Sequence, residues 1–453
     1  MKNGEKSLAQ IRALLTAQQA SQILELFSAL QPYDQAELVS MLAPEERWQV
    51  LHLLPDETLA SIFEELDAEL VAEIVEELEE ERVSRVLCEM SSDDVVDLLA
   101  ELEEEQAEEL LELMEAEDAR EVKSLLTYPE NTAGRLMTNE YVTLKSDWTA
   151  EEALRRLRKE APGAETIYYL YVTDNQEKLV GVVSLRELIV AAADTPIANI
   201  MSENVVFVSA EVDQEEAARL IERYDFLALP VVDENQRLVG IVTVDDVIDV
   251  LEDEATEDFS RLAAIEGITE VSDLRVPAYQ AAFKRLPWLV LLMFFGFISG
   301  NIIARFEKTL EAVAILAIFI PLIADMAGNT GTQSLAVVVR GLAVTEFRPR
   351  DFLWLLRREA GVGLIIGTVN GLLIALLTYL WQGNIWLGFV LGFSLWLTLF
   401  VSTMSGAVVP LILNYFKIDP AVASGPFITT INDIIGLTIY FSVATAFISF
   451  LVP

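Results

Sequence analysis

An aspartate stands in the middle of the last apolar stretch of the chain. Asp433 lies within PFITTINDIIGLTIYF, where an ionised carboxylate is costly unless water, a cation or a hydrogen-bond donor meets it. On a helix, Thr429, Thr430, Gly436 and Tyr440 would share its face. This polar stripe, with a glycine for close approach, favours a cation pathway. The alternative is a structural aspartate that hydrogen-bonds between helices or is protonated.

A second acid inside an apolar stretch, Asp325, precedes a segment of small and polar residues. The segment Gly328-Asn329-Thr330-Gly331-Thr332-Gln333 offers carbonyl, amide and hydroxyl oxygens. Irregular backbone at membrane depth is tolerated only where it is buried in protein or lines water. We therefore expect the segment to interrupt its helix beside a vestibule or pore. The alternative is that its small residues let neighbouring helices pack closely.

The donor atoms in both stretches are oxygens, which are typical ligands of hard cations such as Mg²⁺ or Ca²⁺. Mg²⁺ releases its bound water reluctantly. One carboxylate per chain, doubled in a symmetric dimer, would hold a largely hydrated ion through its waters. Such an ion binds without being trapped, which is what permeation requires.

The elements that position these residues follow from an uneven distribution of charge. The chain of 453 residues has a formal net charge of −41, yet it is 53% hydrophobic. Residues 281–453 carry 10 basic and 8 acidic side chains, whereas residues 1–280 carry 21 basic and 64 acidic ones. We expect an acidic soluble part joined to an apolar part. A net charge of −43 on the first part argues against nucleic acid as a partner, because it repels phosphate backbones.

Residue counts also exclude several kinds of site. A single cysteine, Cys88, permits no internal disulfide, and a single histidine, His52, excludes a histidine-rich zinc site. The sequence contains no nucleophile–base pair, phosphate-binding loop or metalloprotease motif, so we do not expect an enzyme.

Five apolar runs are long enough to cross a bilayer, which takes about 20 residues. They cover roughly residues 288–304, 310–340, 362–381, 385–413 and 424–451. Eight lysines and arginines flank these runs on one side and only Arg305 and Lys308 on the other, which predicts a cytoplasmic soluble part. The N-terminal sequence lacks the apolar core of a signal peptide, in agreement. Five spans of the cell (inner) membrane would then place the C-terminus outside.

Residues 1–130 are rich in leucine, glutamate and alanine with a helical period. Phrases such as SSDDVVDLLAELEEEQAEELLELM recur, each a short helix opened by an aspartate or serine. Repeated short helices predict an acidic N-domain built as a superhelical stack.

Residues 131–252 contain an internal repeat of helices and β-rich runs. IYYLYVTDNQEKLVGVVSLRELI corresponds to FLALPVVDENQRLVGIVTVDDVI, and the segments before them correspond as well. The two copies resemble a tandem pair of cystathionine-β-synthase (CBS) motifs, an α/β regulatory module. Its signature stands as Gly181-Val-Val-Ser184-Leu-Arg-Glu187 and Gly240-Ile-Val-Thr243-Val-Asp-Asp246. The resemblance implies an adenine nucleotide such as ATP at Ser184, Glu187, Thr243 and Asp246; many such pairs bind nothing.

The whole chain resembles one family. An acidic N-domain, a CBS pair, a connecting (plug) helix over residues 253–286 and a five-helix pore domain over residues 287–453 are similar to the MgtE family of magnesium channels and transporters. The membrane motifs are the segment 328–333 and Asp419-Pro420-Ala421-Val422-Ala423-Ser424-Gly425-Pro426, followed by Asp433. The family often has asparagine where Thr332 stands, and some members have it at Gly425. Backbone oxygens would have to serve at those positions.

The resemblance implies a homodimer with one central pore and two groups of Mg²⁺ ligands. At the pore they are Asp433, Thr429, Gly328 and Asn329. The regulatory acids implied for the soluble part and connecting helix are Asp93, Asp97, Asp213, Glu215, Asp225, Asp246, Asp249, Glu254, Glu257 and Asp258.

A regulatory mechanism follows from the charge. Without divalent cations the acidic parts of a dimer repel one another, and Mg²⁺ that bridges facing carboxylates would favour a compact arrangement. We therefore expect high cytoplasmic Mg²⁺ to close the pore, with the connecting helix transmitting the change; a passive linker is the alternative. Two further alternatives stay open at this point. One is a transporter of another cation such as Co²⁺, Mn²⁺ or Ca²⁺, or one coupled to H⁺ or Na⁺. The other is a membrane-tethered Mg²⁺ or nucleotide sensor that transports nothing.

Overall fold

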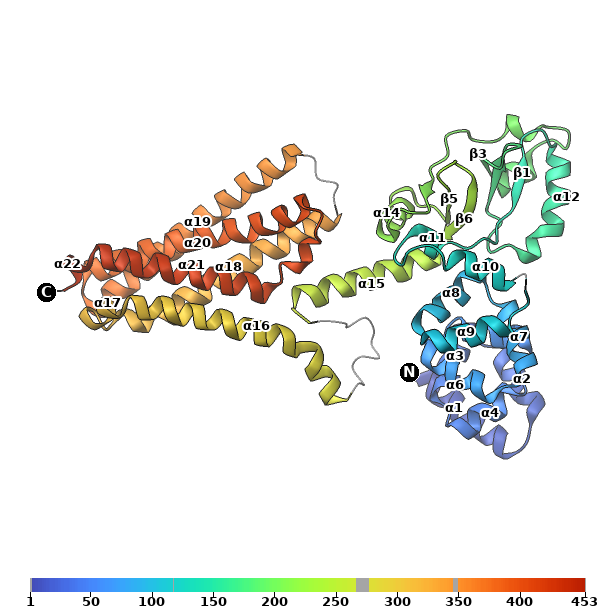
Figure 1. Ribbon diagram of the computed structural model, residues 1–453, viewed down its shortest axis with the longest axis horizontal. Helices are drawn as coiled ribbons and strands as arrows, with labels where there is room; N and C mark the ends of the chain where they lie inside the picture. The colour runs from blue at the N-terminus through green and yellow to red at the C-terminus, as the bar shows by residue number, and fades with distance from the viewer. Residues whose placement is uncertain (1, 117, 266–276, 345–348, 453) are drawn as a thin grey trace. The chain divides into compact units, whose positions relative to one another are not determined.

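The structure, a computed structural model, describes residues 2–116, 118–265, 277–344 and 349–452. The chain divides into two compact units, Met1–Leu251 and Glu252–Pro453 (Figure 1). Each unit is a separate structural body with its own core.

The first unit begins with short helices, as predicted. The described residues before Pro129 form α1 (Lys2–Thr16), α2 (Ala20–Ser28), α3 (Pro32–Met41), α4 (Pro44–Leu51), α5 (Asp56–Phe63), α6 (Ala68–Glu77), α7 (Glu80–Glu89), α8 (Ser92–Glu101), α9 (Glu104–Leu113) and α10 (Asp118–Leu125). Helices α3, α5, α7 and α9 pack in succession on one side, and α6, α8 and α10 on the other. This is the stacked arrangement that repeated amphipathic helices favour, with leucine, isoleucine and valine side chains between the layers.

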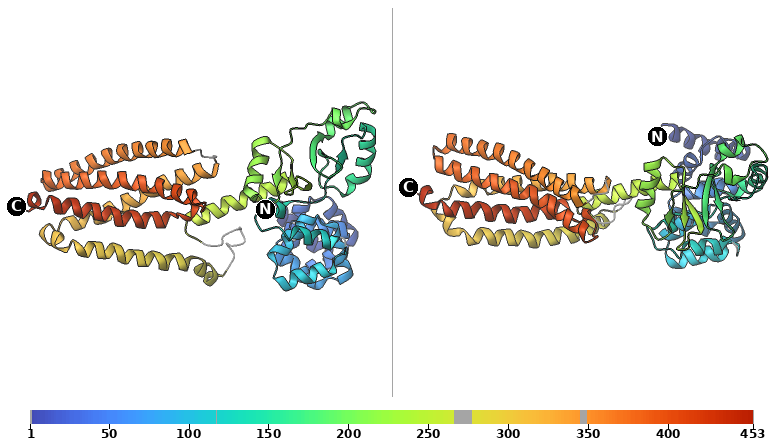
Figure 2. Two further views of the ribbon diagram at one scale, coloured as in Figure 1. Left: turned by 45° about the horizontal axis from the view of Figure 1, so that its top comes forward. Right: turned by 90° about the horizontal axis from the view of Figure 1, so that it is seen from above.

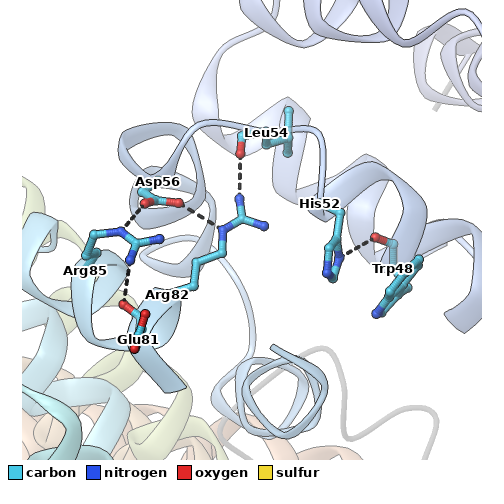
Figure 3. A network of polar contacts seen from close by, with 7 residues as sticks. All are labelled: Trp48, His52, Leu54, Asp56, Glu81, Arg82 and Arg85. Atoms are coloured by element: carbon cyan, nitrogen blue, oxygen red, sulfur yellow. Dashed lines mark hydrogen bonds and ion pairs between the residues drawn. The ribbon is translucent and has the colours of Figure 1, made fainter. Parts of the chain in front are cut away.

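Charged contacts join successive helices of this stack. Asp56 at the start of α5 accepts hydrogen bonds from Arg82 at 2.9 Å and Arg85 at 2.8 Å, both on α7 (Figure 3). The single histidine, His52, lies against Trp48, with its Nδ1 3.1 Å from the Trp48 carbonyl oxygen. His52 thus packs at the end of α4.

Two similar three-stranded sheets follow, which confirms the internal repeat. The first sheet contains β1 (Thr143–Lys145), β2 (Tyr169–Thr173) and β3 (Leu179–Ser184), and the second contains β4 (Val208–Ser209), β5 (Ala228–Val232) and β6 (Leu238–Thr243). In both, the first two strands pair in parallel and the last two pair antiparallel. Helices α11 (Ala133–Leu136), α12 (Ala150–Glu160), α13 (Leu185–Val190) and α14 (Gln214–Tyr224) accompany them, with 3₁₀ turns η1 (Ala161–Gly163) and η2 (Ile197–Asn199).

The hairpin turns of the two sheets are built alike. The Asp174 carboxylate accepts backbone hydrogen bonds from Gln176 and Lys178, and Asp233 accepts them from Asn235 and Arg237. Aspartate favours such turns because its side chain can bond to the backbone two residues on. The repeated Asp-Asn and Glu-Asn pattern therefore marks the same turn twice.

Within the described residues, the predicted connecting segment (residues 253–286) comprises the end of one helix and the beginning of another. Helix α15 (Val244–Leu262) starts directly after β6 and continues past the division between the units. Residues 266–276 lie outside the described part of the chain. The rest of the segment belongs to the beginning of α16 (Ala278–Arg305).

The second unit is a bundle of long helices. After α16 come α17 (Glu307–Ala312), α18 (Leu316–Val344), α19 (Pro349–Gln382), α20 (Ile385–Tyr415), η4 (Pro420–Val422), α21 (Gly425–Ala446) and α22 (Ile448–Leu451). Figure 2 shows the long helices side by side, and α18, α20 and α21 all contact one another.

Within the described residues, four helices are long and apolar enough to cross a membrane, against five predicted. The four comprise Ala281–Arg305, Asp351–Gln382, Ile385–Tyr415 and Gly425–Ala446. The remaining predicted span, residues 310–340, corresponds largely to α18, whose 29 residues extend for about 43 Å. That length exceeds a hydrocarbon core of about 30 Å, but Asp325 and the polar segment 328–333 lower its apolar character.

The expectation of irregular backbone at residues 328–333 is wrong, because α18 is helical throughout. The two glycines of the segment lie where α18 packs against α21. A Cβ at Gly328 would stand 2.6 Å from the Thr429 Cγ2, and one at Gly331 would collide with Asn432. The glycines therefore permit close helix packing, which is the alternative that the sequence left open.

Candidate cation sites

Two acids of the second unit face the same side of the α18–α21 pair. Asp325 and Asn329 are exposed one turn apart on α18, and the Asn329 Nδ2 donates a 3.1 Å hydrogen bond to the Asp325 Oδ1. Asp433 on α21 is half-buried and lies within electrostatic reach of Asp325. The two helices together present carboxylate and amide oxygens to one surface.

One oxygen of Asp433 lacks a partner. Its Oδ1 is buried and accepts no hydrogen bond from the residues that the structure describes. Buried polar atoms in folded proteins are almost always paired with protein or ordered water. A proton, an ordered water or a cation would satisfy this oxygen, and a hydrated divalent cation offers its bound waters as donors.

Thr332 contacts two of the other predicted pore residues, Gly328 and Thr429. The Thr332 hydroxyl donates 3.0 Å to the Gly328 carbonyl oxygen and lies 3.1 Å from the Thr429 hydroxyl. Thr429 is one turn before Asp433 on α21, so the four predicted residues lie on adjoining turns of two contacting helices. Gly328 itself is buried, whereas Asn329 is exposed and Thr429 and Asp433 are half-buried.

The proposed nucleotide residues form two helix caps. The Ser184 hydroxyl accepts from the Glu187 backbone N–H at 3.2 Å, and the Glu187 carboxylate accepts from the Ser184 backbone N–H at 3.0 Å. Thr243 and Asp246 pair through the carboxylate in a similar way at the start of α15. The shared signature is thus a capping motif that begins a helix after a strand.

Carboxylates gather in the first unit around the start of α8. The Ser91 hydroxyl donates a 2.9 Å hydrogen bond to the Glu165 carboxylate, and the Ser91 backbone N–H donates a 3.4 Å hydrogen bond to the Glu64 carboxylate. The Ser92 hydroxyl donates 3.4 Å to Glu140. We call this group the carboxylate cluster; its members are Glu64, Asp93, Asp94, Glu140, Glu165 and Asp246.

The pKa values of the acids in the carboxylate cluster are raised. Burial, followed by the charges of Asp246, Asp94 and Glu165, raises the pKa of Asp93 well above its usual range. Burial also raises the pKa of Asp94 to about 8 and that of Asp246 to about 6. The Asp93 Oδ1 is buried without a hydrogen-bond partner in the described chain. Packed acids with buried faces need protons or cations to offset their repulsion.

The remaining predicted regulatory acids are spread over several places. Asp97 on α8 borders the carboxylate cluster, because its negative charge adds to the effect of burial in raising the pKa of Asp94. The charge of Asp249 on α15 likewise adds to the effect of burial on the pKa of Glu65, which follows the cluster member Glu64. Asp213 caps the start of α14 and Asp225 caps its end, about 18 Å apart along the helix axis. Glu215 pairs with Arg219 on the same helix. Asp213 and Asp225 therefore cannot ligate one ion within a single chain.

The C-terminal end of α15 contacts the loop that leads into α21. Arg261 pairs with Glu257 on its own helix and with Asp419 just before η4. Leu262 packs beside Leu335, Ala423 and Ile428, and its carbonyl oxygen would lie 3.3 Å from a Cβ at Gly425. Glu254 and Asp258 lie on the same stretch of α15. A movement of this helix end would thus displace the residues at the start of α21.

Sequence reasoning missed several members of these groups. Asp94, Glu140 and Glu165 come from separate loops and helices, and no spacing in the sequence links them. Asp94 adjoins a predicted acid, the only available signal. Within the described ranges, no three or more histidine, cysteine or acidic side chains are arranged to hold a metal ion together.

Comparison with known proteins decides the family. A family model described as a divalent cation transporter, MgtE, matches residues 320–443, the MgtE intracellular N domain matches 30–131, and CBS domains match 133–194 and 197–253. The magnesium transporter MgtE of Bacillus subtilis is 52% identical over 324 residues, which are 72% of this chain and 71% of that protein. The chain belongs to the MgtE family.

Other MgtE proteins agree with this assignment. The magnesium transporter MgtE of Enterococcus faecalis is 46% identical over 73% of this chain and 72% of its own length. The solved cytosolic domain of the Mg²⁺ channel MgtE in complex with ATP is 43% identical, with a TM-score of 0.52, and covers 54% of this chain and 99% of that one. The predicted order of a helical N-domain, a CBS pair and a helical membrane part is therefore confirmed.

Proposed function

We propose that the chain is a Mg²⁺ channel or transporter that mediates Mg²⁺ uptake across the cell membrane. Membership of the MgtE family supports Mg²⁺ as the ion. The observation that carries the proposal is the unpartnered carboxylate oxygen of Asp433 beside Asp325 and Asn329. Oxygen donors of this kind are what a hard cation prefers.

The pore forms in a homodimer, with one Asp433 from each chain facing a central, water-filled path. A single carboxylate per chain cannot strip Mg²⁺ of its water, so the ion passes largely hydrated and is held through its waters. The half-buried position of Asp433 and the exposure of Asn329 on the same surface support this arrangement. The soluble unit is cytoplasmic and the C-terminus is outside, as the flanking lysines and arginines indicate.

Cytoplasmic Mg²⁺ closes the pore by acting on the soluble part. In the carboxylate cluster and its neighbours Asp97 and Asp249, bound Mg²⁺ offsets the repulsion between buried acids and so favours tight packing. Glu254, Glu257 and Asp258 extend this response along α15, whose end touches the loop before α21. An ion shifts such an equilibrium only by its different affinity for the two states, and several weak sites acting together give a steep response. Asp213, Glu215 and Asp225 would act only between chains.

ATP is a proposed second ligand of the soluble part, at the two capping motifs. The ATP complex of a 43% identical cytosolic domain supports it. Glu187 is exposed, whereas Asp246 is half-buried and belongs to the carboxylate cluster. We therefore place the ribose at Ser184 and Glu187 in preference to Thr243 and Asp246.

Purified full-length protein in liposomes is expected to take up Mg²⁺ when the inside is made negative, because permeation is driven by the membrane potential. The measurement is the fluorescence of a Mg²⁺ dye trapped inside, with protein-free liposomes as control. Competition by Co²⁺, Mn²⁺ and Ca²⁺ would identify a different preferred ion. Absence of any cation flux, with intact Mg²⁺ binding to the soluble unit, would instead favour the membrane-tethered sensor.

A further inference from the structure

One buried acid of the second unit has no part in the proposed ion path. Glu359 on α19 is 3% exposed, although α19 is a candidate membrane span. The Ser334 hydroxyl of α18 donates a 2.7 Å hydrogen bond to its Oε2, and Arg358 lies 3.9 Å from its Oε1. Ser334 is itself buried. Ionisable residues inside membrane-spanning helices are rare and have a specific partner or a functional role.

The Ser334–Glu359 hydrogen bond lies directly beside residues 328–333 of α18. Ser334 follows the residues 328–333 that pack on α21. On its other side α20 passes very close: a Cβ at Gly406 would stand 3.0 Å from the Ser334 Cβ and would collide with the Gly331 carbonyl oxygen. Helix α18 is therefore held between α19, α20 and α21 at this level.

The contacts continue from Glu359 to the pore acid. Ser334 lies three residues, or nearly one helical turn, after Gly331. Gly331 meets the Asn432 side chain, and Asn432 precedes Asp433. Asn432 is fully buried, so this contact is tightly packed. A rotation of α18 about its axis would thus change the spacing between Asn329 on α18 and Asp433 on α21.

We propose that Glu359 is a positioning residue for the ion path: through Ser334 it fixes the rotation of α18 and so the placement of Asn329 and Asp325 opposite Asp433. This inference rests on the proposed function. A buried side-chain hydrogen bond between two helices is directional, and breaking it leaves a buried polar group without a partner. The Ser334–Glu359 hydrogen bond can therefore fix the rotation of α18 about its axis, where the glycine surfaces of that helix offer no side chain to do so.

The test compares full-length variants in liposomes. Ser334→Ala removes the donor and is expected to lower the Mg²⁺ uptake rate roughly tenfold, because small misplacements of ligating groups carry large costs. It is also expected to change the ratio of Mg²⁺ to Mn²⁺ uptake. Ser334→Thr keeps a hydroxyl, and Glu359→Gln keeps an acceptor oxygen, so both are expected to retain most uptake and the wild-type ion ratio.

A matched control removes a buried hydroxyl that does not join helices. Thr403 on α20 is fully buried, and its hydroxyl donates 2.7 Å to the Leu399 carbonyl oxygen of its own helix. Thr403→Ala is expected to leave the ion ratio unchanged. If Ser334→Ala keeps the wild-type uptake and ion ratio, or merely matches Thr403→Ala, the positioning role is wrong.

A second readout does not depend on transport. Thermal unfolding of the wild type, Ser334→Ala, Glu359→Ala and the double variant forms a double-mutant cycle, in which interacting side chains give non-additive effects. Additive effects would show that the hydrogen bond does not join α18 to α19 and would overturn the proposal. A non-additive cycle together with no uptake by the wild type would leave the contact standing and reject the proposed function.

Discussion

Alanine at position 433 will abolish Mg²⁺ uptake. Hydrogen bonds to a charged group are worth about 1.5–3 kcal/mol each, and a dimer loses at least one in each chain. A factor of ten corresponds to about 1.4 kcal/mol, so we expect uptake to fall by roughly 100-fold or more. Asp433→Asn removes the charge but little volume, and we expect it to fail as well. Flux into dye-loaded liposomes is the measurement.

Variants of neighbouring residues separate a pore role from general damage to the bundle. Thr438 is exposed on the same helix, and its hydroxyl donates 2.7 Å to the Ile434 carbonyl oxygen, so Thr438→Ala is a matched control that should keep uptake. Asp325→Ala should lower uptake less than Asp433→Ala, because Asp325 already has the Asn329 amide as a partner. Uptake by Asp433→Ala at half the wild-type rate would contradict the proposed ion path.

Removal of divalent cations will loosen the first unit, increasingly so at high pH. Burial raises the pKa of Asp94 from 3.8 to about 8 and that of Asp246 from 3.8 to about 6. Acids with raised pKa values in the folded state stabilise it fully only below the unfolded pKa, near pH 4, and this stability is lost as the pH rises through about 6 and about 8. Each pKa unit corresponds to about 1.4 kcal/mol.

Hydrogen exchange of α8 in the full-length protein measures this effect. Without divalent cations, its amide protection should fall between about pH 5 and pH 8, a range set by the two pKa values above. Addition of Mg²⁺ should restore protection more at the alkaline end than at the acidic end, where the acids are largely protonated. Asp94→Asn should remove much of the Mg²⁺ dependence, whereas Asp34→Asn, an exposed acid on α3, should not. Protection that rises with pH in the absence of Mg²⁺ would contradict this account.

The parts of the fold that follow from local patterns were predictable from the sequence. The CBS repeat was visible because the same strand–turn–strand–helix order occurs twice, with the Asp174 and Asp233 turns at matching places. Asp433 stood out because a charge inside a membrane-length apolar run is rare and costly. The helix caps at Ser184 and Thr243 explain why the CBS signature has its spacing.

Other features depend on which helices meet, and no single-sequence pattern shows that. Residues 328–333 look like a helix breaker, yet Gly328 and Gly331 pack against α21 and the helix continues. Glu359 follows Arg357 and Arg358 and therefore resembles the charged boundary of a span, although its side chain points into the bundle. The carboxylate cluster draws on α8, α15 and three loop positions (Glu64, Glu140 and Glu165), so only tertiary contact brings its members together.

Thiol cross-linking at position 433 tests the central claim most directly. The single native cysteine, Cys88, is changed to serine, and Asp433→Cys or the control Thr438→Cys is introduced into the full chain. If two copies of residue 433 face each other across a water-filled path, a short bifunctional thiol reagent will link Asp433→Cys chains into covalent dimers. A charged, membrane-impermeant thiol reagent will also label them, and the Thr438→Cys control will react in neither way. An Asp433→Cys protein that stays unlinked and unlabelled, as expected for a side chain facing lipid or a dry contact, would contradict the account.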